Sequence, residues 1–140
     1  MFIDEINQAL EALDAAHDET VEEARKLLKE LWDEMRRSGE VRFRGATISI
    51  KGNGKYVDIY WFKMAYKSHQ HGSQEKPFLT RVPKGRGFRY SRKGMGQMDY
   101  FTDALFQNYE DKFSVLRELF SKYKSVRREL DRIKVIAKKL

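Results

Sequence analysis

The fold of this chain is decided by residues 51–66, which read KGNGKYVDIYWFKMAY. Gly52, Asn53 and Gly54 tolerate positive φ angles, so they predict a tight hairpin turn. The run 56–66 is rich in aromatic and β-branched residues, which favours a central strand with both faces at least partly covered. The stretch therefore predicts an antiparallel hairpin whose second strand lies inside a small sheet.

The segments before and after residues 51–66 are predicted to supply the other strands of this sheet. Residues 41–50 alternate apolar side chains with basic or polar ones, which predicts the first strand. A short apolar run lies between Pro77 and Pro83, and prolines at both ends suit an edge strand. We therefore expect three strands within residues 41–82, with an exposed loop at 67–76.

Two long amphipathic segments flank the predicted sheet. Apolar residues recur every three or four positions over residues 4–38 and again over 98–140, which predicts one long helix in each segment. The second helix has a candidate break near Asn108. An antiparallel pair would bury both apolar stripes. The predicted fold class is α+β, with two long antiparallel helices, N- and C-terminal, flanking a small antiparallel sheet within a single domain, residues 1–140.

Polar residues interrupt both apolar stripes. His17 and Thr20 lie on the first stripe, and Arg127 lies on the second. We predict that His17 packs at the helix interface against an acidic or hydroxyl group. Arg127 is expected to meet a carboxylate or a backbone carbonyl, or to reach solvent, because an unpaired buried charge is costly.

The amino-acid composition excludes several classes of function. The 140 residues include no cysteine, which excludes disulfides, thiol catalysis and cysteine-ligated metal sites. There is no apolar run long enough to span a membrane and no signal-peptide pattern at the start. We therefore expect a cytoplasmic protein that does not enter the membrane.

Positive charge is concentrated in the middle of the chain. Residues 1–38 carry a net charge of −6, residues 39–96 one of +10, and residues 97–140 one of +3. A surface with so many cations and so few acids is typical of proteins that neutralise phosphates. The alternative is a solvated surface that only promotes solubility.

The densest basic segment is the glycine-rich loop, residues 83–97. Its glycines would let the backbone approach a partner closely, and Arg86 and Arg89 are the best candidates for contacting bases in a DNA groove. Tyr90, which lies among these cations, is the aromatic candidate for ligand contact. The candidate nucleic-acid-binding residues in the whole chain are Arg42, Arg44, Lys51, Lys55, Lys84, Arg86, Arg89, Tyr90, Arg92 and Lys93.

Other motifs carry weaker signals. Tyr56, Tyr60, Phe62 and Tyr66 share one strand face, and we predict that this face packs into the core. The pair His69 and His71 is a weak metal signal without further ligands nearby. The glycines of the basic loop lack P-loop spacing, and the basic segment has no cluster of carboxylates. We therefore predict no catalytic residues, no metal, no cofactor and no enzymatic activity.

Three segments of the chain resemble the MobI family, which comprises small accessory proteins of conjugative plasmids and integrative conjugative elements. These segments are Val41–Lys63, Pro83–Tyr90 and Leu116–Leu130. The resemblance implies a protein that helps a relaxase to find or open the origin of transfer, working on double-stranded DNA without cutting it. It supplies no set of functional residues, so the candidates above rest on charge and spacing.

Two other functions stay open from the sequence. One is a phage- or plasmid-encoded protein-interaction module or inhibitor, whose basic face acts on a nucleic-acid-binding partner. The other is an RNA-binding regulator. The long apolar stripes also leave room for a homodimer, because a second copy could cover what the intramolecular pair leaves open.

Overall fold

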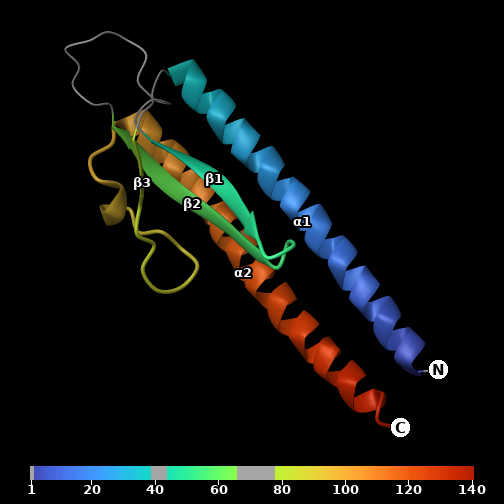
Figure 1. Cartoon of the computed structure of the whole chain (residues 1–140). Coiled ribbons are helices and arrows are strands. Elements are labelled where there is room, and N and C mark those ends of the chain that lie inside the picture. Colours follow the sequence, from blue (N-terminus) through green and yellow to red (C-terminus); the bar gives the residue numbers. More distant parts are fainter. Residues whose placement is uncertain (1, 39–43, 66–77) are drawn as a thin grey trace.

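The computed structural model describes residues 2–38, 44–65 and 78–140 (Figure 1). The elements are α1 (Phe2–Ser38), β1 (Arg44–Lys51), β2 (Tyr56–Ala65), β3 (Phe78–Arg81), the short 3-10 helix η2 (Lys93–Met95) and α2 (Tyr100–Ala137). The three strands form an antiparallel sheet in the order β1-β2-β3. The predicted α+β architecture is therefore confirmed, with β3 at an edge.

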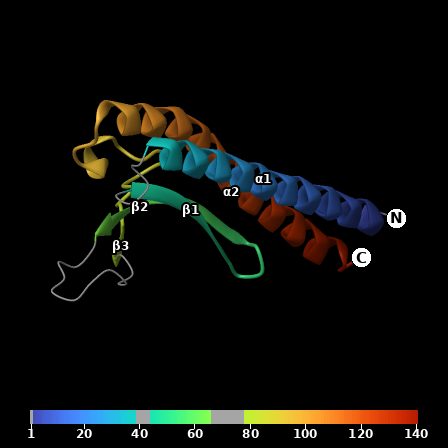
Figure 2. The same cartoon turned by 90° about the horizontal axis from the view of Figure 1, so that it is seen from above.

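The two helices form one layer and the sheet forms the other (Figures 1 and 2). α1 and α2 run antiparallel, and their N- and C-terminal ends extend together beyond the sheet. α2 begins with the Asp99 side chain accepting a hydrogen bond from the Thr102 backbone N–H at 2.7 Å, a typical N-cap. The helix continues through Asn108, so the expectation of a break there was wrong.

The hairpin between β1 and β2 forms as its sequence predicts. Gly52, Asn53 and Gly54 have φ angles of 62°, 57° and 88°, which lie in the left-handed region that glycine and asparagine tolerate. Lys51 pairs with Tyr56 across the turn. Several predicted positions lie outside the described residues, namely Arg42, Tyr66, His69 and His71.

The predicted packing of the aromatic face of β2 into the core is confirmed for Phe62, which is buried, and for Tyr60, which packs against the core, although α2 covers the opposite face. Ile59 and Trp61 are buried, and the Trp61 ring lies 5.1 Å from that of Phe106 between centroids. The prediction that the aromatic face of β2 packs into the core was wrong for Tyr56, which is 54% exposed. Phe62 on that face is buried because Trp32 of α1 reaches over the sheet, with ring centroids 6.0 Å apart.

A glycine makes room for Trp32. A Cβ atom at Gly45 would lie only 2.5 Å from the Trp32 ring, which is closer than real Cβ atoms come to a neighbour. The Trp32 indole N–H donates a hydrogen bond to the Ala46 carbonyl at 2.9 Å. This contact ties α1 to the edge strand β1, and no periodicity in the sequence indicates it.

The helix interface contains the predicted polar positions. His17 packs edge-on against the rings of Phe120 and Tyr123, with centroids 5.4 and 5.8 Å away. The hydroxyl groups of Thr20 and Tyr123 lie 3.1 Å apart. Arg127 forms an ion pair with Asp14 of α1. The predictions of an interface histidine and of a carboxylate partner for Arg127 are confirmed. The expected acidic or hydroxyl partner of His17 on the other helix is not seen, because His17 packs on aromatic rings of α2 and the carboxylate beside it, that of Asp18 at 3.9 Å, belongs to α1.

Candidate nucleic-acid interface

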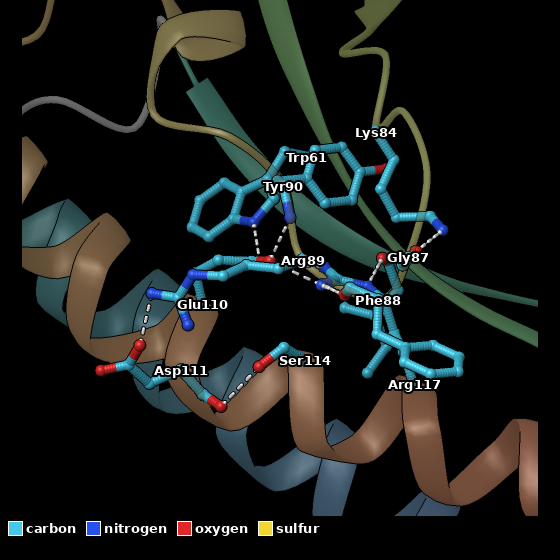
Figure 3. A network of polar contacts seen from close by, with 11 residues as sticks. Trp61, Lys84, Gly87, Phe88, Arg89, Tyr90, Glu110, Asp111, Ser114 and Arg117 are labelled. Carbon is cyan, nitrogen blue, oxygen red and sulfur yellow. Dashed lines mark hydrogen bonds and ion pairs between the residues drawn. The ribbon is translucent and has the colours of Figure 1, made fainter.

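A buried ion pair between Glu110 and Arg117 of α2 lies beside the glycine-rich loop and forms hydrogen bonds to it (Figure 3). Glu110 is 0% exposed and Arg117 is 6% exposed. Two guanidinium nitrogens of Arg117 donate to the two carboxylate oxygens of Glu110, at 2.7 and 3.0 Å. The pair is bidentate, which is the strongest geometry for this type of contact.

The same two side chains also form hydrogen bonds to other elements. Arg117 also donates to the carbonyls of Ile59 in β2 and Phe88 in the loop, both at 2.8 Å. Glu110 accepts from the Trp61 indole N–H at 2.8 Å and from the Tyr90 backbone N–H at 2.6 Å. Because buried charges need such partners, this network holds the loop against both the sheet and α2.

The structure corrects the prediction for Tyr90. Its side chain is buried, and its ring lies 4.6 Å from the Arg117 guanidinium carbon. Burial raises the pKa of Tyr90 above its usual 10.0. A buried ring cannot stack on a base, so Tyr90 belongs to the support of the loop and not to a ligand contact.

The tip of the loop is shaped by two glycines. Gly85 and Gly87 have φ angles of 80° and 81°, a conformation that other residues rarely adopt. The Lys84 ammonium group donates to the Gly87 carbonyl at 2.5 Å and closes the tip (Figure 3). This turn leaves Arg86 exposed and the Phe88 ring 37% exposed.

A basic groove of about 400 Å³ lies between the hairpin, this loop and α2. Asp58 is the one acid among its lining residues, all of which the structure describes, and Asp58 is paired with Arg81. Lys51, Lys55 and Lys84, all predicted from the sequence, meet here. The groove is lined by Ser49, Lys51, Lys55, Tyr56, Val57, Asp58, Arg81, Lys84, Phe88, Arg117, Phe120, Ser121 and Lys124.

Two aromatic rings border the basic groove. The Lys124 ammonium lies 4.2 Å from the centroid of the exposed Tyr56 ring, within the range of a cation–π contact. Phe88 lines the opposite, loop side. Proteins that bind unpaired nucleotides combine exposed aromatic rings, on which bases stack, with cations that contact phosphates.

A second groove, of about 570 Å³, continues beyond Tyr56 towards the helix pair. It shares Lys55, Tyr56 and Lys124 with the basic groove. Its lining is mixed, because Arg127 and Arg128 face Asp14, Asp18 and Asp131. Phosphate binding is therefore favoured in the basic groove and not in its neighbour.

Three other predicted cations serve the structure of the loop. Arg44 donates to the carbonyls of Met95, at 3.1 Å, and Gln97. Arg89 forms an ion pair with Asp111. Arg92 binds Asp103 at 2.7 Å and the Gly96 carbonyl at 2.5 Å. These guanidinium groups are partly used by the protein itself, so they are weaker candidates for phosphate contact.

Arg86 and Lys93 remain exposed on the loop and on η2, outside the basic groove.

Arg81, Lys124 and Phe88 line the groove but were not among the predicted site residues, and Tyr56 was assigned to the core. Lys124 lies on a helix face of mixed charge, and only its contact with Tyr56 identifies it. Phe88 could have been found, because it follows Gly87 within the basic loop.

A family model described as MobI protein matches residues 20–131. The chain belongs to the MobI family. The matched range includes the hairpin, the glycine-rich loop and most of α2, and hence every residue that lines the basic groove. Membership of this family makes the chain a mobilisation-related accessory protein.

No curated protein and no solved structure shows a significant match to the chain. None of the described helices has an apolar stretch long enough to cross a membrane. Within residues 2–38, 44–65 and 78–140, no group of three or more His, Asp or Glu side chains is placed to hold a metal ion.

Proposed function

We propose that this protein is a non-enzymatic DNA-binding accessory factor of conjugative transfer, which helps a relaxase to recognise the origin of transfer. The basic groove carries this proposal. It gathers four lysines, Lys51, Lys55, Lys84 and Lys124, that have no carboxylate partner among the described residues. Family membership supplies the mobilisation context.

Electrostatics support DNA as the ligand. Each lysine that neutralises a phosphate releases a condensed counterion, so affinity depends steeply on salt. Ion pairs elsewhere in the described chain tie up cations such as Arg89, Arg92 and Arg127. The groove lysines form no ion pair with a described carboxylate, although Lys84 donates to the Gly87 carbonyl and Lys124 lies over the Tyr56 ring, so their positive charge is available to an anionic ligand.

The proposal is tested with two variants of equal net charge. One replaces the groove residues Lys51, Lys55, Lys84 and Lys124 with alanine. The other replaces the exposed lysines Lys26, Lys29, Lys138 and Lys139, which do not line either groove. Fluorescence anisotropy with labelled origin-of-transfer DNA at several salt concentrations compares them, and circular dichroism checks that both are folded.

We expect the groove variant to lose affinity and to lower the salt slope by ~0.7–0.9 for each phosphate contact removed. The control variant should retain most of the parent's slope. Transfer frequency of an element that carries each variant should follow the same order. Equal losses in the two variants would mean that only total charge matters, and the protein-interaction alternative would then be preferred.

A further inference from the structure

We propose that the basic groove binds unpaired, single-stranded DNA and not the duplex, with the rings of Tyr56 and Phe88 as its stacking surfaces. This inference rests on the proposed function, because it specifies the form of DNA that the same groove takes. It is carried by three features of the groove: its exposed rings, its concave shape and its continuation past Tyr56.

The rings are placed for stacking. Tyr56 is 54% exposed and Phe88 is 37% exposed, and both line the groove. A base in a duplex is stacked between its neighbours and hides both ring faces, whereas an unpaired base offers a face to each aromatic side chain.

The Lys124 ammonium lies over one face of the Tyr56 ring, 4.2 Å from its centroid, so a base would stack on the other face with this positive charge close by. Lys55 lines both grooves next to the same ring. A base on Tyr56 would therefore have cations within reach of its own phosphate. Single-strand-binding sites combine cations and aromatic rings in this way.

The shape of the groove favours a single strand over a duplex. Its volume of about 400 Å³ falls in the ~300–1,000 Å³ range of pockets that hold small molecules, which is room for about one or two nucleotides. A duplex is read instead by a convex element that enters its major groove, which is ~12 Å wide. The basic groove is a hollow between the hairpin, the loop and α2.

The strand has a continuous path. The basic groove and its neighbour meet at Lys55, Tyr56 and Lys124. A strand whose phosphates bind in the basic groove would leave it over Tyr56 towards the exposed Arg128 on α2, where Asp14, Asp18 and Asp131 offer its phosphates no further binding site. The Tyr56 ring thus lies at the junction of the two grooves, where an unpaired base would meet it.

The test uses the full chain and three labelled probes of about 20 nucleotides, longer than the ~4–16-nucleotide sites of single-strand-binding folds. The probes are a mixed-sequence single strand, its blunt duplex and RNA of the same sequence. The variants are Tyr56→Leu, Tyr56→Phe and Phe88→Leu. Tyr100→Leu and Phe101→Leu are matched controls, because both rings are exposed on α2 and lie outside the grooves.

We expect the parent to bind the single DNA strand more tightly than the duplex. Tyr56→Leu and Phe88→Leu should each weaken that binding by roughly tenfold, as expected for the loss of one stacked base. Tyr56→Phe, which keeps the ring, should retain it. The control variants should leave it unchanged.

Three results would overturn the inference. Preference for the duplex, with no effect of the ring variants, would leave DNA binding intact and remove the single-strand assignment. Tighter binding of RNA would assign the groove to RNA. Binding of none of the probes at low salt would remove both this inference and the proposed function.

Discussion

Replacing Arg117 with methionine should destabilise the protein more than any change to an exposed cation. Arg117 donates four hydrogen bonds, two to Glu110 and one each to the Ile59 and Phe88 carbonyls. Methionine fills much of the volume but leaves the Glu110 carboxylate, which is 0% exposed, without a counter-charge. Breaking a buried pair in this way costs ~3–5 kcal/mol, a large part of the ~5–15 kcal/mol that stabilises a typical domain.

Urea denaturation followed by far-ultraviolet circular dichroism measures this cost. Arg128→Met is the control, because it removes the same charge from an exposed position of α2 and should change stability by less than ~0.5 kcal/mol. Glu110→Gln should also destabilise strongly. The double variant should cost less than the sum of the two by about 1–3 kcal/mol, because the two groups interact directly. A free energy of unfolding for Arg117→Met within ~1 kcal/mol of the parent's would refute the account of this network.

Three further predictions follow from single side chains. Phe120→Ala should cost ~3–5 kcal/mol of unfolding free energy, because the ring is 5% exposed and leaves a cavity, whereas Leu119→Ala on the outer face of α2 should cost less than ~1 kcal/mol; similar losses would contradict the helix packing. Burial, with Glu34 and Glu30 nearby, raises the pKa of Tyr109 from 10.0 to about 12, so the fold is favoured by the neutral phenol below pH 10 and loses that contribution as the pH rises from 10 to 12. Tyr109→Phe should therefore reduce the loss of stability in alkaline denaturation, and an unchanged alkaline profile would count against this. Gly52→Ala and Gly54→Ala both strain a left-handed residue by ~1–2 kcal/mol, but only the first places a Cβ atom against the Tyr56 ring, at 2.8 Å from Cδ2, so only Gly52→Ala should also weaken DNA binding in the anisotropy assay.

The features predicted correctly from the sequence depend on local patterns. The helices follow from apolar residues spaced three or four apart, and the hairpin follows from the conformational freedom of Gly52 and Asn53. Arg127 and its carboxylate partner could be anticipated because a charge on an apolar stripe must be paired. In each case neighbouring residues carry enough information to decide the structure.

The errors concern contacts between distant segments. Tyr90 looks like a ligand-binding residue beside its basic neighbours, but Glu110 and Arg117 draw its segment into the core. The aromatic face of β2 looks like the core face, but α2 packs on the face of Ile59 and Trp61. Strand alternation separates the two faces without indicating which of them a helix covers.

The charge pattern predicted the basic groove only in part. It correctly selected Lys51, Lys55 and Lys84, which lie together in the fold. It also selected Arg44, Arg89 and Arg92, whose partners are backbone carbonyls and the carboxylates of Asp111 and Asp103. Sequence charge cannot separate a free cation from a paired one, because pairing depends on residues that only the fold brings close.

Mapping amide chemical shifts by nuclear magnetic resonance shows whether the basic groove is the surface that contacts DNA. A chain of 16.6 kDa suits two-dimensional spectra recorded with and without a single-stranded oligonucleotide. We expect the perturbed amides to cluster at Lys51–Tyr56, Lys84–Phe88 and around Lys124, with the end of α1 near Phe2 unaffected. Perturbations that cluster on the outer face of α2 or along α1, with the groove segments unchanged, would contradict this expectation.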